Sequence, residues 1–200
     1  MEQQLATYRN YQSEDTWSRT TSLRGFPIDE LRSVLQKNIR RGNVEEAAIA
    51  AFEFFSSGAD AEEVLWRRLE IIATEDVGLG MPTAPAVIDA LYKQAGRMAD
   101  PGDRWIYCAH AVRLLATAPK DNMSMELSGW TRGVVESGER GVLVEDFMVD
   151  LHTRRGVGMG RTVAHWWENG AKLFNRIPGY DSKWGDYLRK KAGANVTNEE

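Results

Sequence analysis

The residues best placed to do chemistry lie in a glycine- and arginine-rich stretch, DLHTRRGVGMGRTVAHW, at positions 150–166. Backbone amides at the start of a helix, joined by arginine side chains, can bind a phosphate group or a DNA backbone. That role would fall to Arg154, Arg155 and Arg161. The glycines follow a G-x-G-x-G spacing after no apolar strand, whereas a dinucleotide fingerprint needs strand, turn and helix in that order. The stretch therefore indicates a phosphate or nucleic-acid contact, or else a structural or partner-facing turn whose arginines pair with the acidic body.

Acid–base and metal chemistry have few candidates in this sequence. His152 and His165 flank the glycines, and with Asp150 they could form an acid–base group, but no nucleophile with an orienting third residue accompanies them. The histidines show no i, i+4 pair of the kind that binds zinc, and Cys108 lies among apolar residues, as a small core residue does. We therefore expect no catalytic residue, no metal site and no cofactor, and we expect the chain not to be an enzyme.

Aromatic and basic residues alternate in the last fifth of the chain. This pattern can stack single-stranded bases and hold their phosphates, although tryptophans more often anchor cores and interfaces. The residues concerned are Trp166, Trp167, Lys183, Trp184, Tyr187, Arg189, Lys190 and Lys191. Positions 151–191 carry nine Lys or Arg against three Asp or Glu, a net charge of +6, whereas positions 1–150 carry sixteen against twenty-four, a net charge of −8. Any attraction to nucleic acid should therefore come from the C-terminal fifth.

Two segments combine an apolar helical stripe with a polar turn: RRLEIIATEDVGL at 67–79 and LLATAPKDN at 114–122. In the first, Glu75 and Asp76 oppose the negative end of the helix dipole, so a donor such as Arg67 or Arg68 should lie nearby. We expect both segments to form structural turns rather than an acid–base site. The turn residues are Arg67, Arg68, Glu75, Asp76, Pro119 and Lys120.

Apolar residues at spacings of three and four positions predict the elements that carry these turns. The expected helices cover about 28–39, 43–55, 60–72, 83–97, 100–118 and 123–137, with one more near 161–174. Asn43 with Glu46 and Asp60 with Glu63 have the spacing of a capping box, and Asp100 before Pro101 marks a helix start. In 43–55 the expected buried stripe is Ala47, Ala48, Ala51, Phe52 and Phe55. Short connections favour an all-α, antiparallel bundle of about six to seven helices.

Composition divides the chain into three expected parts. Positions 1–25 form a polar N-terminal arm, 26–140 form the helical domain, and 141–200 form a basic, Gly- and Trp-rich extension. We expect the extension to pack on the body, because Phe147, Trp166 and Phe174 need apolar cover. No run reaches the ~18 apolar residues of a membrane helix, and the N-terminus has no secretory pattern. These features predict a cytoplasmic protein with no membrane contact.

The two turn segments, together with LRSVLQKNIRRGNVEEAAIAAFEFFSSGAD at 31–60, carry a family resemblance. In this order they resemble the C-terminal helical region of the replication-associated recombination protein A family, the Werner-helicase-interacting AAA+ ATPases related to clamp loaders. The resemblance covers about ninety residues and implies a collar that self-associates, commonly as a tetramer, and holds ATPase modules together.

The sequence contains no G-x-x-x-x-G-K-[ST] phosphate loop, so none of the family's nucleotide-binding residues can be assigned here. We therefore expect a non-enzymatic assembly protein of DNA replication, recombination or repair, a dimer or tetramer that docks an AAA+ ATPase subunit. The interface would use aromatic residues of the first three helices, such as Phe54 or Trp66. The alternative is a nucleic-acid-binding accessory factor that contacts DNA through its basic C-terminal fifth.

Overall fold

The computed structural model describes residues 19–195, which fold into two compact units that divide between Glu136 and Ser137. Among these residues the chain forms nine α-helices and no strand beyond an isolated bridge between Thr21 and Pro27. The predicted all-α class is confirmed. Within 19–195 no helix combines the length and apolarity needed to cross a bilayer.

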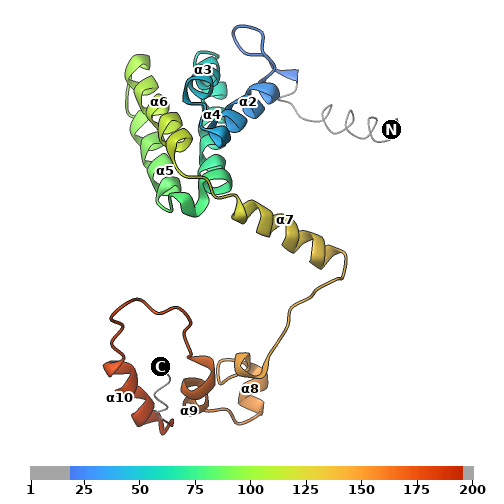
Figure 1. The fold of residues 1–200 in the computed structure, drawn as a ribbon, viewed down its shortest axis with the longest axis vertical. Helices are drawn as coiled ribbons and strands as arrows, with labels where there is room; N and C mark the ends of the chain where they lie inside the picture. Colours follow the sequence, from blue (N-terminus) through green and yellow to red (C-terminus); the bar gives the residue numbers. More distant parts are fainter. Residues whose placement is uncertain (1–18, 196–200) are drawn as a thin grey trace. The chain divides into compact units, whose positions relative to one another are not determined.

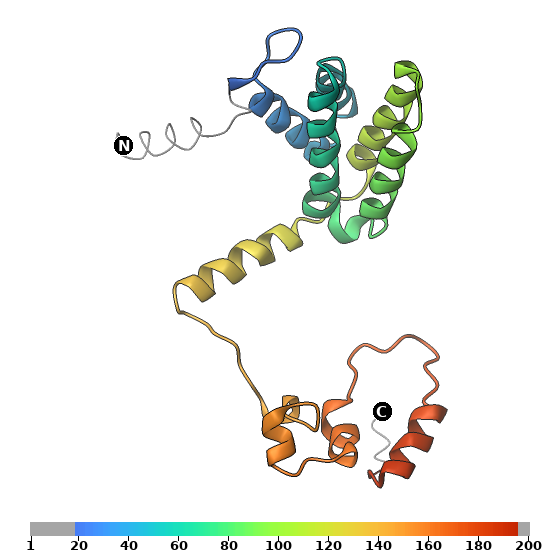
Figure 2. The same cartoon turned by 180° about the vertical axis from the view of Figure 1, so that it is seen from behind.

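The first unit contains helices α2 to α7, which follow one another through short turns. Their bounds are α2 Ile28–Arg41, α3 Val44–Phe55, α4 Ala59–Ile72, α5 Ala84–Ala95, α6 Pro101–Thr117 and α7 Met123–Glu136. A π-helical turn, η2 (Ala73–Val77), and a 3-10 turn, η3 (Gly78–Gly80), join α4 to α5. Helix α3 packs on α2 and α6, and α5 also packs on α6, so α2 to α6 form a bundle that Figures 1 and 2 show from opposite sides.

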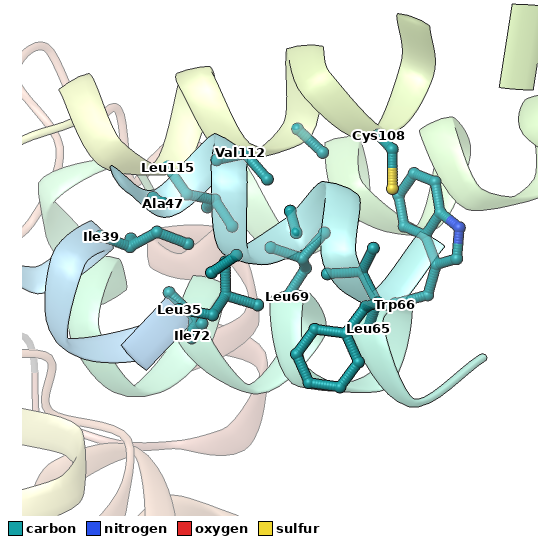
Figure 3. Close-up of a cluster of buried hydrophobic side chains, with 14 of the residues drawn as sticks. Leu35, Ile39, Ala47, Leu65, Trp66, Leu69, Ile72, Cys108, Val112 and Leu115 are labelled. Atoms are coloured by element: carbon teal, nitrogen blue, oxygen red, sulfur yellow. The ribbon is translucent and has the colours of Figure 1, made fainter. Parts of the chain in front are cut away.

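The core of the bundle comes from one apolar face of each helix, as the spacing predicts. Fully buried side chains from three of the helices are labelled in Figure 3: Leu35, Ile39, Leu65, Trp66, Leu69, Ile72, Val112 and Leu115. Phe54 of α3 is also fully buried in this core. Each large apolar side chain removed from water contributes about 1.5–3 kcal/mol of transfer free energy. Cys108 also lies in this core, where burial raises the pKa of its thiol, so it acts as the small buried residue that its neighbours predict.

Helix starts agree with the sequence at one site and differ at two. Oδ1 of Asp100 accepts hydrogen bonds from the backbone amides of Gly102 and Asp103, as a helix cap does. Asn43 caps nothing with its side chain, which donates to Asn38 instead. Helix α4 begins at Ala59, ahead of the predicted cap, and no side chain caps it. These two predicted capping boxes were therefore wrong, while the helices themselves are present.

Helix α3 buries Ala47 and Ala51 as predicted, with Ala48 and Phe55 packed against the core, but it differs from the prediction at its phenylalanines. Phe54 is fully buried, whereas Phe52 is 40% exposed. The loop before α2 covers the other side of this helix, because the amide and guanidinium of Arg24 donate to Glu53, at 3.0 and 2.6 Å. Burial alone raises the pKa of Glu53, but hydrogen bonds from Ser22 and Arg24 outweigh it and lower the pKa. A charged residue is thus buried in α3 while a phenylalanine stays outside.

The second unit consists of short elements. They are η4 (Asp146–Met148), α8 (Arg154–Gly158), α9 (Val163–His165) continued by the π-helical turn η5 (Trp166–Gly170), and α10 (Lys183–Ala192). The predicted helix near 161–174 corresponds to α9 and η5, and α10 was not predicted. Phe174, expected to need cover, is 99% exposed. That the extension packs on the body stays a prediction. Of the predicted arm, residues 1–18 lie outside the described part of the chain.

Candidate functional site

The two acidic residues of the turn after α4, Glu75 and Asp76, contact donor side chains of α2. Nε of Arg40 lies 2.5 Å from Oδ1 of Asp76, and the amide nitrogen of Gln36 donates to Oδ2 at 2.8 Å. Glu75 receives a longer contact from the same arginine, at 3.4 Å. The expected donor exists, but its predicted identity was wrong: Arg67 pairs with Glu63 within α4, and no hydrogen bond joins Arg68 to the acidic pair. Asp76 is 1% exposed with both oxygens bonded, so it ties α2 to η2.

The two turn segments that stand forty residues apart in sequence meet at this corner. The amide of Asp121 donates to the carbonyl of Asp76, and one carboxylate oxygen of Asp121 accepts from the amide of Leu79, both at 3.0 Å. The other oxygen accepts from the amide of Met123, the first residue of α7. Hydrogen bonds from these two amides lower the pKa of Asp121. The corner therefore fixes the start of α7 relative to η3.

Close backbone approach explains the glycines of this corner. A Cβ atom on Gly80 would lie 2.3 Å from the carbonyl oxygen of Pro119, and one on Gly78 would lie 2.6 Å from that of Asp121. Lys120 satisfies the end of α6, since its Nζ donates to the carbonyls of Ala116 at 3.0 Å and Ala118 at 2.5 Å. Burial lowers the pKa of Lys120. Residues of both motifs thus serve as packing and capping groups.

The three arginines of the glycine- and arginine-rich stretch, Arg154, Arg155 and Arg161, have two different roles. The guanidinium of Arg161 is mostly buried and donates to the carbonyls of Asp146 and Val149 and to the Asp146 carboxylate. It holds η4 against α8, so its hydrogen-bonding capacity serves the fold. Arg154 and Arg155 lie exposed on α8. Among the predicted phosphate contacts in this stretch, these two arginines keep accessible side chains.

One of the two histidines of the second unit, His152, contacts Asp150. Nδ1 of His152 lies 3.1 Å from Oδ2 of Asp150, and its ring packs edge-on against Trp166. The neighbouring hydroxyl of Thr153 accepts from the amide of Gly156, so it caps α8. Nδ1 of His165 is buried without a hydrogen-bond partner. Among residues 19–195 no group of His, Cys, Asp and Glu is arranged to hold a metal ion.

Helix α10 carries the remaining predicted nucleic-acid contacts. Lys190 and Lys191 are exposed near its C-terminus. Trp184 and Tyr187 are also largely exposed, at 73% and 64%. Trp167 has a different role, because the guanidinium of Arg189 stacks over its ring at 5.1 Å from the centroid. The charged and aromatic surface of this unit therefore lies on α8 and α10.

An apolar surface groove of the bundle lies between α3 and α6. Phe26, Ile49, Phe52 and Trp105 line it, with Arg24 at its polar edge. Ile49 is 65% exposed and Phe26 53%. The rings of Phe52 and Trp105 pack edge to face, 4.9 Å between centroids. We call this surface the aromatic groove.

Sequence reasoning placed the interface aromatics on the wrong residues. Phe54 and Trp66 are 0% and 2% exposed, so both belong to the core. The exposed aromatic residues that line the groove were not singled out from the sequence. In the run of phenylalanines at the end of α3, a shift of one or two positions exchanges a core residue for a surface one. The residue between Phe52 and Phe54, Glu53, is buried because the loop before α2 covers it. That cover is a feature of the structure and cannot be recognised from helix periodicity.

Comparisons with known proteins agree with this architecture. The sequence model of the family described as MgsA AAA+ ATPase C terminal matches residues 44–160. Replication-associated recombination protein A of Bacillus subtilis is 32% identical over 146 residues, which cover 70% of this chain and 34% of the relative. An uncharacterized AAA domain-containing protein of Mycobacterium tuberculosis is 29% identical over 128 residues, 64% of this chain and 28% of the relative. The chain thus spans about a third of the length of these relatives.

Proposed function

The chain belongs to the MgsA AAA+ ATPase C-terminal family, and from that premise we propose that it is a non-enzymatic assembly domain of DNA replication, recombination or repair. It associates with copies of itself and provides a collar for AAA+ ATPase modules. The name of the Bacillus subtilis relative supports the replication and recombination role. The sequence has no phosphate loop, so we expect no ATP hydrolysis by this chain alone.

The observation that carries the proposal is the aromatic groove on a bundle whose core is already complete. The buried faces of α2 to α6 are filled without Phe26, Ile49 or Phe52. Apolar surface left in water costs about 25 cal/mol per Å², and a contiguous apolar patch on a folded unit is typical of a contact site. Aromatic residues near the centre of such a surface supply most of the association energy in protein interfaces. We therefore place the contact between copies at this groove.

A charge placed in the groove tests the assignment. Phe52→Glu should convert the protein from a dimer or tetramer to a monomer at micromolar concentration, as measured by light scattering after size-exclusion chromatography. Val142→Glu is the matched control, because Val142 is 94% exposed in the second unit and should tolerate the same change. Circular dichroism should show unchanged helix content in both variants. If Val142→Glu also loses the oligomer, or if Phe52→Glu keeps it, the contact between copies does not lie at the aromatic groove.

A second candidate function is nucleic-acid binding by the second unit. The observation behind it is the exposure of two arginines on α8 and two lysines on α10, within the segment of +6 net charge. Binding should then fall steeply with salt, because each neutralised phosphate releases counterions. Fluorescence anisotropy with single- and double-stranded DNA at low salt provides the measurement. Changing Arg154, Arg155, Lys190 and Lys191 to alanine should abolish binding, while Arg161 is left intact because it holds the fold.

A further inference from the structure

Three arginines converge on a hollow of the bundle between α2 and α4. Arg32 comes from α2, Arg67 and Arg68 come from α4, and Val64 and Ile71 complete the lining. Val64 is buried and Ile71 is 46% exposed, so the hollow has apolar walls beneath its charges. We call this surface the arginine hollow. It lies on a different pair of helices from the aromatic groove, which is formed by α3, α6 and the loop before α2.

Arg68 has a buried hydrogen-bond donor that the fold leaves unsatisfied. Its NH1 makes a long contact of 3.4 Å with Oε1 of Gln36, and its Nε is buried without a hydrogen-bond partner. Burial lowers the pKa of Arg68, and the positive charge of Arg32 lowers it further. Glu75 and Asp76 attract the guanidinium and oppose that shift. A guanidinium stays charged at neutral pH, so a positive group is held here despite desolvation and like-charge repulsion.

The nearest carboxylates of the bundle are engaged with other donors. Asp76 accepts from Arg40 with one oxygen and from Gln36 with the other. Glu63 accepts from Nε of Arg67 and, through its second oxygen, from a tyrosine hydroxyl of α5. Each oxygen of these two groups therefore already has a donor. Glu75 also attracts Arg68, and its Oε1 contacts Arg40 at 3.4 Å. An anion brought from outside the bundle can pair with the guanidinium of Arg68, which lines the hollow.

We propose that the arginine hollow binds a carboxylate side chain presented by an acidic and aliphatic segment of a partner protein. The planar fork of an arginine matches a carboxylate through two parallel hydrogen bonds. These bonds are stronger in a partly buried site than in water, because the local dielectric constant is lower. The apolar walls suit an aliphatic side chain next to the carboxylate. This function is separate from self-association through the aromatic groove, and it assigns to the bundle a second contact of different chemistry.

Charge around the hollow favours a peptide over nucleic acid. Glu70 and Glu75 line the adjoining groove next to Ile71. Residues 19–136 carry fourteen Lys or Arg against seventeen Asp or Glu, a net charge of −3. A DNA duplex presents one phosphate charge per about 1.7 Å along its axis, so a duplex seated here would bring further phosphates against these acids. A short peptide can place one carboxylate in the hollow without that repulsion.

The test uses the full chain and a fluorescently labelled peptide with a single glutamate flanked by leucines. Anisotropy titration should show saturable binding, and the same peptide with glutamine in place of glutamate should not bind. Arg68→Gln and Arg67→Gln should each weaken binding by about tenfold, the loss expected for one charge-assisted hydrogen-bonded pair. Arg113→Gln is the matched control, because Arg113 is an exposed arginine of α6 outside the hollow. Its affinity should equal that of the unchanged protein.

Arg67→Gln keeps the test decisive even where Arg68→Gln disturbs folding, because the Arg67 side chain is 71% exposed. Size-exclusion chromatography of Arg67→Gln should show the oligomer of the unchanged protein, so loss of peptide binding and loss of self-association are separate results. Absence of saturable binding, equal affinity for the glutamine peptide, or equal weakening by Arg113→Gln overturns the proposal. Displacement of the peptide by duplex DNA through the same arginines also overturns it, since it assigns the hollow to nucleic acid.

Discussion

The helical bundle and the second unit are stabilised by different forces. The bundle buries more than twenty apolar side chains in one cluster drawn from α2 to α6 and the η2 turn. In the described part of the second unit, the buried apolar residues are Val149 and Ala194. Its short elements are joined instead by the hydrogen bonds of Arg161 to Asp146 and Val149, which we call the Arg161 clamp, by the bonds of His152 to Asp150, and by the contact between the tilted rings of Trp166 and Trp167. One region is stabilised by apolar burial and the other largely by polar contacts.

This difference changes how the side chains of each region should be interpreted. In the bundle, some apolar residues, such as Ile49 and Phe52, lie outside the buried core and keep exposed surface. In the second unit, a polar group that resembles a ligand-binding residue can already be part of the fold, as Arg161 is. The contacts that we propose for the bundle therefore use its exposed apolar and arginine-lined surfaces.

The largest effect should come from opening the core. Leu69→Ala removes a side chain that is 0% exposed, so it should lower the free energy of unfolding by about 2–5 kcal/mol through lost transfer energy and a cavity. Urea denaturation followed by circular dichroism measures this change. Leu79→Ala is the control, because Leu79 is 77% exposed and its truncation should cost less than about 0.5 kcal/mol. Similar losses in both variants would mean that the bundle is not held by this core.

The corner between η3 and the segment before α7 should show an intermediate effect. Gly80→Ala places a Cβ atom 2.3 Å from the carbonyl oxygen of Pro119, so backbone must shift, at a cost of about 1–3 kcal/mol. Gly129→Ala on α7 is the matched control, since no atom lies within 4 Å of its added Cβ. That variant should gain up to about 1 kcal/mol from helix propensity. Thermal denaturation of the two proteins should therefore move in opposite directions.

The sequence predicts the helices of the bundle better than it predicts the contacts between their side chains. Helices α2 to α6 follow from apolar spacing because the core that they share requires that spacing. The donor for Asp76 was not predictable, because Arg40 lies 36 positions earlier and only packing of α2 on η2 brings it close. Helix α10 escaped prediction because its aromatic residues are exposed among charges and form no buried stripe. Phe52 and Phe54 exchange roles because a loop, rather than helix periodicity, covers Glu53.

In the second unit, removing the Arg161 clamp should act locally. Arg161→Met deletes the donors to the carbonyls of Asp146 and Val149, so amide hydrogen exchange in 146–161 should accelerate by about tenfold. Exchange in the bundle should not change, which makes α4 an internal control within the same experiment. Faster exchange in both units would show that the clamp supports more than its own surroundings.

Acid should affect this unit through Asp150, with a smaller effect. Hydrogen bonds from the amide and ring of His152 lower the pKa of Asp150 below its ordinary value. The resulting stabilisation is present above the unfolded pKa of about 3.9 and is lost as the pH falls through the lower folded pKa. Exchange at 150–156, followed by NMR as the pH is lowered, should accelerate below that point. Asp150→Asn should show the faster exchange at neutral pH and little further change in acid.

The central claim is that the aromatic groove joins copies of this chain. Sedimentation equilibrium of the unchanged protein across the micromolar range, beside Ile49→Glu, tests it most directly. Ile49 is 65% exposed, so a charge there should leave the fold intact. The account predicts a dimer or tetramer for the unchanged protein and a monomer for the variant. A monomer for both, or the same oligomer for both, would contradict it.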